Sequence, residues 1–201
     1  YESAGNLRLA MLADGEVSDY RRALILVDGI ASVTYRRGGI GYTRTLFASY
    51  PAQVIAMRLT ADKPGAIAFT ASYDRENGRE VCVQDNLMCV RGETSSGGHR
   101  FDGKIRFDVV GGTCTADGET LVVSGADAVC IYIALKTEGE AILPEIASFD
   151  ALMAEHIADF SAIMSRADIA YDYDEAIDAL PVNERLARIK AGNTDAGLVN
   201  L

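Results

Sequence analysis

The sequence of 201 residues contains no tryptophan, only four prolines and only two histidines. It also lacks a long apolar run: residues 128–135 form one of the longest, far short of the roughly 20 residues that a membrane-spanning helix needs. A basic excess is absent too, since the formal net charge is −10 and the isoelectric point is about 4.7. Nucleic-acid binding requires clustered lysine and arginine side chains that neutralise phosphates. We therefore expect a soluble protein that neither spans a membrane nor binds nucleic acid.

The chain does contain enough apolar material for a folded core, and its charge is unevenly distributed. Hydrophobic residues make up 49% of the sequence, which excludes global disorder and indicates one domain with an appendage. Residues 138–184 contain twelve acidic residues and one basic residue, Arg166, whereas the first 137 residues are nearly balanced. This change predicts a β domain over residues 1–140 and an acidic helical linker over residues 141–201. Because the chain starts without methionine and both ends read as cut, we expect it to come from a longer polypeptide.

Four cysteines lie in strand-like segments: Cys82, Cys89, Cys114 and Cys130. They form no Cys-x-x-Cys pair and have no histidine close by, which favours buried free thiols over a metal or redox site. Cys82 and Cys89 could be joined across a hairpin, but the sequence does not fix the Cα separation that a disulfide requires. The compartment stays open, with the bacterial cytoplasm favoured over secretion because the thiols read as free.

Short strands separated by turns are indicated for residues 6–137. Apolar and polar residues alternate in residues 31–36, 55–59 and 67–73, so that one face of each strand suits burial. Ten or more such strands predict a mainly β chain, an antiparallel β-sandwich followed by a short α-helical linker. Three glycine-containing dipeptides suit the positive φ angles of tight hairpins: Asp28-Gly29, Gly38-Gly39 and Asp117-Gly118.

Other segments carry more specific predictions. Residues 128–135 are apolar on both faces, which predicts a central strand covered on both sides. Residues 91–103 are rich in glycine and serine and are predicted to form a long exposed loop. After about residue 140 the period becomes helical, and Ser148 is placed to cap a helix with an apolar stripe. A second helix is predicted over residues 183–191, with Asn183 as its cap and Gly192 as its stop.

Candidate catalytic residues are few. His156 lies on the apolar stripe of the first predicted helix, where a histidine is usually a hydrogen-bonded packing residue, and His99 stands alone in the glycine-serine loop. Glycoside hydrolysis needs two carboxylates held several ångströms apart, and the acidic run reads instead as a solvated linker. No serine or cysteine triad and no phosphate-binding glycine loop is visible. We predict no catalytic, cofactor-binding or metal-binding residue in this chain. The acidic run comprises Asp172, Asp174, Glu175 and Asp178.

A series of short segments resembles the N-terminal domain of one enzyme family. No single segment is chemically diagnostic, but their order and spacing extend over nearly the whole chain. They are Tyr20-Arg21-Arg22-Ala23-Leu24, Asp28-Gly29-Ile30-Ala31, Val33-Thr34-Tyr35, Gly41-Tyr42-Thr43-Arg44, Phe47-Ala48-Ser49-Tyr50-Pro51, Gln53-Val54-Ile55, Arg58-Leu59-Thr60, Gly125-Ala126-Asp127-Ala128, His156-Ile157-Ala158-Asp159-Phe160, Leu180-Pro181 and Glu184-Arg185-Leu186. Together they resemble glycoside hydrolase family 95, the bacterial-type α-L-fucosidases.

The resemblance implies a fold, a parent enzyme and a partner. In that family a β-sandwich of the galactose-mutarotase-like super-sandwich type precedes a helical linker and an (α/α)6 barrel, which carries the acid and the asparagine-activated base of an inverting hydrolysis. This chain resembles the later part of the β domain and the linker. The opening strands and the barrel are therefore expected to lie outside it. The implied partner is the parent's own barrel, with fucosylated or galactosylated oligosaccharides as the parent's substrates and no cofactor.

Two departures limit what the resemblance implies. No catalytic residue carries over, because the barrel motifs have no counterpart here, and Val182 stands where the family tends to place a helix-capping threonine. The alternatives are a free-standing carbohydrate-binding module, a purely structural or oligomerising domain, and the domain of an α-L-galactosidase-like relative. The absence of tryptophan speaks against the module, since such modules usually stack aromatic side chains on sugar rings. We also expect the isolated chain to form a homo-oligomer.

Overall fold

A computed structural model describes residues 3–75, 78–95, 97–167 and 174–199. Contacts divide the chain into two compact units, Tyr1–Ile163 and Met164–Leu201. The first unit contains the described strands and all but the last residue of the helix α1 (Phe149–Met164). The described helices of the second unit are α2 (Glu175–Asp178), α3 (Val182–Lys190) and α4 (Ala196–Val199).

Twelve strands are described, and short turns connect many of them. Gly29, Gly38 and Gly118 adopt positive φ angles of 65°, 57° and 58° in three of these turns, a conformation that glycine adopts without strain. The hairpins predicted at these positions are confirmed. The strands are β1 (Asn6–Met11), β2 (Val17–Ile25), β3 (Ile30–Arg37), β4 (Ile40–Ser49), β5 (Val54–Ala61), β6 (Ile67–Asp74), β7 (Arg79–Gln84), β8 (Leu87–Glu93), β9 (Arg100–Val110), β10 (Thr113–Asp117), β11 (Thr120–Ala126) and β12 (Ala128–Thr137).

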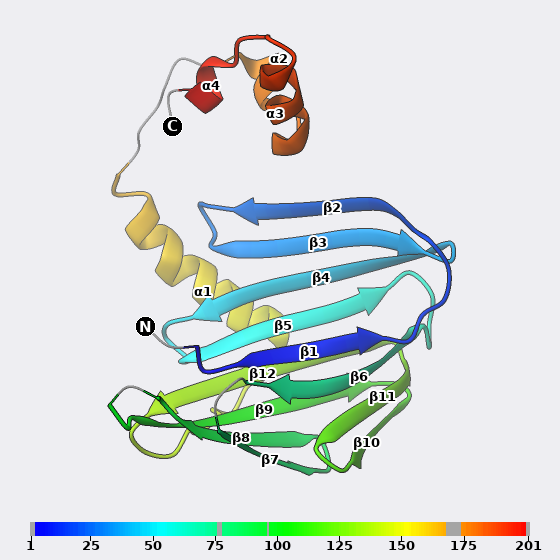
Figure 1. Cartoon of the computed structure of the whole chain (residues 1–201), viewed down its shortest axis with the longest axis vertical. Coiled ribbons are helices and arrows are strands. Elements are labelled where there is room, and N and C mark those ends of the chain that lie inside the picture. The colour runs from blue at the N-terminus through cyan, green and yellow to red at the C-terminus, as the bar shows by residue number, and fades with distance from the viewer. Residues whose placement is uncertain (1–2, 76–77, 96, 168–173, 200–201) are drawn as a thin grey trace. The chain divides into compact units, whose positions relative to one another are not determined.

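The described strands pair into two sheets, and each pairing is antiparallel. The large sheet has the order β2-β3-β4-β5-β12-β9-β8-β7, and the small sheet has the order β1-β6-β11-β10. The small sheet contacts β5, β7 and β9, whereas the edge strand β2 is separated from β5 by β3 and β4 in the large sheet (Figure 1). The predicted fold class, a mainly antiparallel β-sandwich with a short helical segment, is confirmed.

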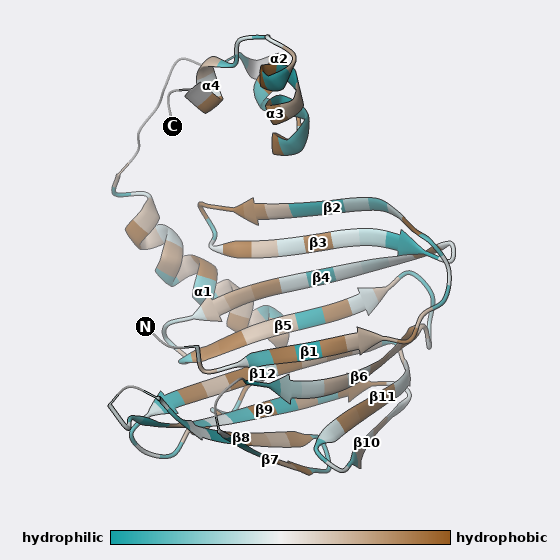
Figure 2. Ribbon diagram, viewed as in Figure 1, coloured by the Kyte–Doolittle hydropathy of each residue, from teal (hydrophilic) through white to brown (hydrophobic). Residues whose placement is uncertain are grey.

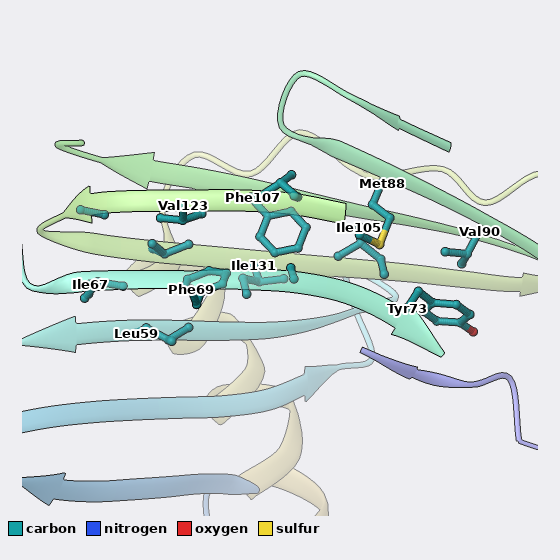
Figure 3. Close-up of a cluster of buried hydrophobic side chains, with 14 of the residues drawn as sticks. Leu59, Ile67, Phe69, Tyr73, Met88, Val90, Ile105, Phe107, Val123 and Ile131 are labelled. Atoms are coloured by element: carbon teal, nitrogen blue, oxygen red, sulfur yellow. The ribbon is translucent and has the colours of Figure 1, made fainter. Parts of the chain in front are cut away.

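Alternate side chains of both sheets fill the space between them (Figure 3). Phe69 and Ile67 of β6 and Val123 of β11 are fully buried against side chains of the large sheet, among them Phe107 and Ile131. The ring centroids of Phe69 and Phe107 lie 6.5 Å apart. This inter-sheet core is the reason that the strands alternate apolar and polar residues in sequence.

The strand β12 is covered on both faces, as its uncharged sequence predicted. It lies between β5 and β9 in the large sheet. Val129 and Ile131 belong to the core between the sheets, while Tyr132 and Ala134 belong to a second core on the outer face of the large sheet. A strand buried on both faces has no polar side to alternate with, which explains its continuous apolar run.

The helix α1 closes the second core. The hydroxyl oxygen of Ser148 accepts a hydrogen bond from the Ala151 N–H at 3.1 Å, so the predicted cap is confirmed. Phe149 is buried, and the Arg58 guanidinium lies 4.4 Å from the centroid of its ring. Arg58 also binds Asp150 at 2.7 Å. The helix is thus tied at its first turn to strand β5.

The prediction of a long loop over residues 91–103 is wrong. Strand β8 continues to Glu93 and β9 begins at Arg100, so the exposed connection is confined to residues 94–99, of which residue 96 is not described. A Cβ atom on Gly92 would lie 2.4 Å from Cε1 of Phe101, and one on Gly103 would lie 2.6 Å from Cγ2 of Val90. These glycines occur because neighbouring side chains pack directly on the backbone, and they do not mark turns.

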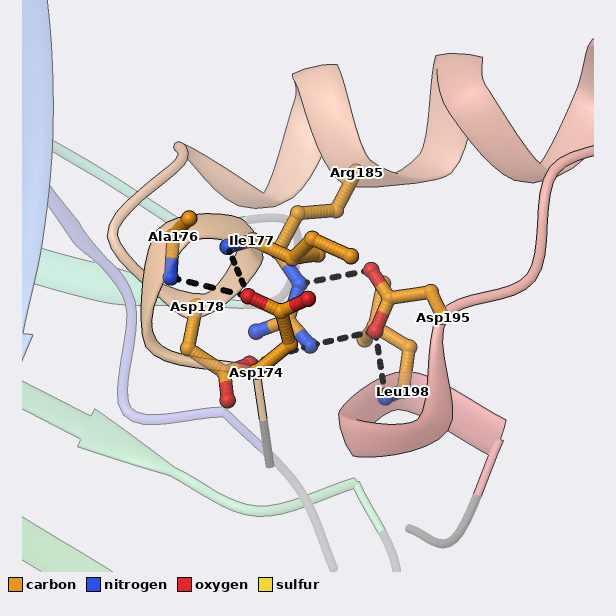
Figure 4. Close-up of polar contacts among 7 residues, drawn as sticks. All are labelled: Asp174, Ala176, Ile177, Asp178, Arg185, Asp195 and Leu198. Carbon is orange, nitrogen blue, oxygen red and sulfur yellow. Dashed lines mark hydrogen bonds and ion pairs between the residues drawn. The ribbon is translucent and has the colours of Figure 1, made fainter. Parts of the chain in front are cut away.

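The second unit is organised around one arginine (Figure 4). The Arg185 guanidinium donates hydrogen bonds to both carboxylate oxygens of Asp195, at 2.8 Å and 2.6 Å, and lies 2.6 Å from a carboxylate oxygen of Asp178. The Leu198 N–H donates to Asp195 at 3.0 Å. Asp195 is only 1% exposed, so its charge is buried beside a partner that is partly exposed.

The cap predicted for the second helix is wrong by two residues. The residue before α3 is Pro181, whose φ of −57° and ψ of 145° are not helical, so the helix begins after it. No side chain makes a capping hydrogen bond to this helix. Asn183 therefore lies within the first turn. The predicted stop is confirmed, because Gly192 has a φ of +89° and its N–H donates to the Ile189 carbonyl at 2.9 Å.

Helix length and polarity also bear on membrane insertion. Among the described residues, no helix combines the length and the apolar composition that crossing a bilayer requires.

Candidate functional site

An open cleft of about 920 Å³ lies at one end of the large sheet. Strands β7, β8 and β9 supply its walls, and the segment after β12 supplies its rim. Its lining is rich in charged residues and in glycine, which is typical of a surface that contacts polar groups. The lining residues are Gly78, Arg79, Glu80, Arg91, Gly92, Glu93, Arg100, Phe101, Asp102, Glu138, Gly139 and Glu140.

Asp102 is the most buried carboxylate of the cleft. The register of the sheet places it opposite Arg91 on β8, and the Arg91 Nε–H donates to its Oδ1 at 2.9 Å. The Ala141 N–H donates to its Oδ2 at 2.8 Å. Burial acts to raise the pKa of Asp102, but these hydrogen bonds and the charge of Arg91 prevail and hold the pKa below its ordinary value. Asp102 is therefore ionised at neutral pH and is unsuited to donate a proton.

Further carboxylates of the cleft are also paired with cations or with histidine. Glu140 accepts a hydrogen bond from Lys104 at 2.6 Å, and this bond raises the pKa of the lysine. The Arg100 guanidinium lies 3.6 Å from Glu93. His99 lies with its Nδ1 3.3 Å from Glu138, an ion pair only when the imidazole is protonated. The histidine predicted to be solitary thus has a carboxylate partner, although it is exposed.

The aromatic side chain of the cleft is covered. Phe101 is 9% exposed, and its ring lies against Gly92 with the Arg75 guanidinium 5.0 Å from the ring centroid. A sugar ring needs an open aromatic face for stacking, and this ring already holds a cation on its face. The cleft can therefore offer hydrogen bonds and charges to a ligand, but Phe101 does not offer it a stacking platform.

His156 lies outside the cleft, in the second core. It is 2% exposed, and its ring stacks on Phe47 with a centroid separation of 4.8 Å and an interplanar angle of 21°. The ring centroid of Phe160 lies 5.6 Å away on the same helix. Its Nε2 lies 3.3 Å from the Gly29 carbonyl, which accepts a hydrogen bond when that nitrogen carries the proton. The predicted packing position of His156 is confirmed.

The acidic run is held more firmly than a solvated linker requires. The Asp174 carboxylate accepts hydrogen bonds from the N–H groups of Ala176 and Ile177, at 3.0 Å and 3.3 Å, and so caps α2. Asp178 binds Arg185 as described above. Asp172 and the side chain of Glu175 lie outside the part of the chain that the structure describes.

The comparison that decides the family covers most of the first unit. The sequence model described as "Glycosyl hydrolase family 65, N-terminal domain" matches residues 1–141. The chain belongs to this family. It is the N-terminal β-sandwich domain of a glycoside hydrolase family member.

Two curated relatives of this family 65 N-terminal domain are fucosidases. "Alpha-L-fucosidase 2" of Arabidopsis thaliana is 42% identical over 77 residues, which cover 37% of this chain and 9% of the relative. "Probable alpha-fucosidase A" of Aspergillus oryzae is 28% identical over 128 residues, which cover 61% of this chain and 18% of the relative. The chain thus spans less than a fifth of the length of either protein.

The fold of the family 65 domain agrees with a solved structure. A "putative kojibiose phosphorylase from human microbiome" aligns with a TM-score of 0.50 at 8% identity, covering 84% of this chain and 26% of that protein. At such low identity the likeness shows the fold alone.

Sequence reasoning missed the Arg91 and Asp102 pair. These residues lay in the segment interpreted as a loop, so their positions across a β-ladder were not predicted. A usable signal was present, because Phe101, Gly103 and Ile105 alternate with polar residues as a strand requires. The glycines outweighed that signal.

Proposed function

We propose that this family 65 domain is the non-catalytic N-terminal domain of an α-L-fucosidase of the glycoside hydrolase family 95 type, and that it supports an (α/α)6 catalytic barrel. The observation that carries the proposal is the 42% identity with the plant α-L-fucosidase over 77 residues. The series of segments that resembles family 95 agrees with this identity. The parent's substrates are then fucosylated oligosaccharides, with an α-L-galactosidase-like parent as the alternative.

The chemistry of the proposed parent is assigned to the barrel. Inverting hydrolysis needs one carboxyl group with a raised pKa as the acid and a second carboxylate as the base, roughly 6.5–9.5 Å apart. In the cleft of this domain, Asp102 has a lowered pKa and Glu93, Glu138 and Glu140 already have partners. These groups suit a rigid supporting surface better than they suit acid catalysis.

An exposed apolar edge supports the proposal of a packing partner. We call it the β2 edge, and its residues lie in the edge strand of the large sheet and in the turn that follows it, each more than half exposed. Figure 2 shows that the apolar part of β2 is its end, after a hydrophilic middle. Leu24, Leu26 and Val27 lie close together in the chain at this end of the strand, and exposed apolar side chains that cluster often mark a protein interface. We propose that the barrel of the parent covers part of this surface. The β2 edge consists of Val17, Tyr20, Leu24, Leu26 and Val27.

Activity measurements test the catalytic half of the proposal. The 201-residue chain is incubated with an aryl α-L-fucoside and with an aryl galactoside, beside the full parent polypeptide as the positive control. We expect the chain to release the aryl group no faster than buffer does. The parent should hydrolyse the aryl fucoside, and NMR should show that the released fucose has the inverted anomeric configuration. Release by the chain alone that is lost in Asp102→Asn would contradict the proposal.

Binding measurements separate the supporting role from a carbohydrate-binding module. The chain is titrated by calorimetry with fucosylated oligosaccharides and, separately, with the barrel expressed as its own polypeptide. A supporting domain binds the barrel and gives no heat with the sugars. Saturable sugar binding that is weakened by Arg91→Ala would instead assign a carbohydrate-binding function to the cleft.

A further inference from the structure

Two of the four cysteines face each other across an edge hairpin. Strands β7 and β8 are joined by a two-residue turn at Asp85 and Asn86, in which Asp85 has a φ of 53°. The register pairs Gln84 with Leu87, and two steps further along the ladder it pairs Cys82 with Cys89. Because facing residues of an antiparallel pair project from the same side of the sheet, both sulfur atoms leave the hairpin in the same direction.

The separation across the ladder suits a disulfide. Directly opposite residues in antiparallel strands have Cα atoms about 4.5–5.5 Å apart. A disulfide joins residues whose Cα atoms are about 4.4–6.8 Å apart. The register therefore supplies the Cα separation that the sequence alone left open, and the backbone does not have to move to bring Cys82 and Cys89 within reach.

The other two cysteines have different neighbours. Cys114 on β10 lies opposite Val123 and packs against the core between the sheets. Cys130 on β12 lies opposite Arg58 on one side and Asp108 on the other. Neither has a cysteine as its ladder partner. They serve as internal controls for reactivity that depends on facing geometry.

Exposure sets the order in which the facing pair reacts. Cys82 is exposed at the edge of the large sheet, whereas Cys89 is half-buried in the neighbouring strand. A dissolved reagent therefore reaches Cys82 first, and the sulfur of Cys89 is positioned to attack afterwards. This is the arrangement of an accessible thiol beside a resolving thiol.

We propose that Cys82 and Cys89 are a redox modification site, which closes to a reversible cross-strand disulfide when the chain meets a small-molecule disulfide such as oxidised glutathione. The Cys82 thiolate attacks one sulfur of the reagent, a mixed disulfide forms, and the first glutathione leaves as a thiolate. The Cys89 thiolate then attacks the Cys82 sulfur and expels the second glutathione thiolate. The two protons of the cysteine thiols end on the two glutathione molecules, which are reduced as the two cysteines are oxidised.

Closure ties the edge strand β7 to β8 by a covalent bond as well as by its ladder. Strand β7 lies at the edge of the large sheet. Its side away from β8 has no strand partner among the described residues. We therefore expect slower hydrogen exchange of the β7 amides and a melting temperature higher by roughly 5 °C. The inference is independent of the proposed glycosidase role.

The experiment is a thiol count with peptide mapping. The 201-residue chain is incubated with oxidised glutathione, unfolded, and titrated for free thiols before and after addition of dithiothreitol. We expect the count to fall from four to two and to return to four on reduction. Trypsin cuts after Arg79 and Arg91, so residues 80–91 hold both cysteines in one peptide. That peptide should be lighter by two hydrogen atoms after oxidation.

Variants separate this site from general thiol oxidation. A Cys114→Ser, Cys130→Ser double variant should still lose two thiols, whereas Cys82→Ser should carry at most one glutathione on residues 80–91 and form no intramolecular bond. Recovery of the wild-type peptide with both thiols free, or with two glutathiones, would overturn the proposal. So would a disulfide that links two copies of the chain through Cys82. The mass of the wild-type peptide decides the question even where a variant fails to fold.

Discussion

Gly29 and His156 lie so close that each restricts the size of the other. A Cβ atom on Gly29 would lie 3.1 Å from Nε2 of His156 and 3.0 Å from Cδ1 of Phe160, and the residue has a φ of +65°. The Gly29 carbonyl in turn faces the imidazole. Glycine at this turn therefore does two things: it permits the positive φ, and it leaves room for the His156 ring. The helix that carries this ring begins at Phe149, 120 residues after Gly29.

We predict that His156→Ala lowers the free energy of unfolding by on the order of 1–3 kcal/mol, because the stack on Phe47 and the hydrogen bond to Gly29 are both lost. Glu155→Ala, at an exposed position of the same helix, should change it by less than about 0.5 kcal/mol. Urea unfolding followed by circular dichroism measures both. Metal analysis of the wild type should give no stoichiometric ion that His156→Ala removes; such an ion would show that the histidine is a ligand.

Gly29→Ala is expected to destabilise the domain by roughly 2 kcal/mol, since it adds a positive-φ penalty to the contact with Phe160. Gly39→Ala is the matched control, because Gly39 also has a positive φ, of 80°, but nothing lies within 4 Å of its added Cβ. The difference between the two variants isolates the packing cost. Equal unfolding midpoints in urea would mean that the contact with the helix contributes nothing.

Among the elements of the fold, helix α1 is held on the large sheet by contacts at its first turn. Ser148 caps the helix, and Arg58 from strand β5 binds Asp150 and covers the Phe149 ring. A cation near the first turn is unfavourable to the helix dipole, so this contact is expected to stabilise the helix by holding it on the sheet rather than by aiding helix formation. The helix position is therefore set by tertiary contacts that begin at its cap.

We predict that Ser148→Ala lowers the free energy of unfolding by about 1 kcal/mol, the usual cost of losing an N-cap hydrogen bond. Ser165→Ala is the matched control, because Ser165 is an exposed serine just after the other end of the same helix, and its replacement should change the free energy by less than about 0.5 kcal/mol. Differential scanning calorimetry on both variants would show the contrast. If Ser148→Ala melts at the same temperature as the wild type, the Ser148 cap does not stabilise α1.

The elements that were predicted well are those whose cause is local. Strand β12 and the helix α1 follow from apolar patterns within their own residues, and the hairpins follow from glycine at the turns. The prediction for residues 91–103 is wrong because the side chains that require glycine there come from other parts of the sheet. Phe101 packs on Gly92, and Val90 and Leu135 pack on Gly103. The ion pairs of the cleft were not predicted, because they involve residues of that segment. Asp195 was likewise missed, because its partner Arg185 is fixed by the fold of the second unit rather than by a pattern in sequence.

At the scale of the second unit, Asp195 makes stability depend on acidity. Hydrogen bonds from Arg185 and then from the Leu198 N–H lower its pKa to about 2, from 3.8 in an ordinary aspartate. Between these pH values the unfolded chain binds more protons than the folded one, so stability falls as the pH falls through this window and is fully present above it. NMR of the Leu198 amide should report the loss. Asp195→Asn should abolish this dependence, whereas Glu184→Gln, exposed on α3, should retain it.

The whole first unit has two sheets of unequal width, and this inequality predicts association. The large sheet has eight described strands against four in the small sheet, and the β2 edge lies beyond the cover of the small sheet with its apolar side chains exposed. An unpaired edge strand and an apolar surface both favour pairing with another chain. We predict that the 201-residue chain self-associates, so that sedimentation equilibrium gives an average mass above 21.5 kDa that rises with concentration.

Charges placed on the β2 edge test whether this surface makes the contact. Leu24→Lys together with Leu26→Lys should weaken association by roughly tenfold or more, because charges enter the contact. Ile142→Lys is the control, since Ile142 is even more exposed, at 76%, but lies outside the β2 edge. A single species of 21.5 kDa at every concentration would show that the β2 edge is stable in water, and the case for a partner that covers it would lose this support.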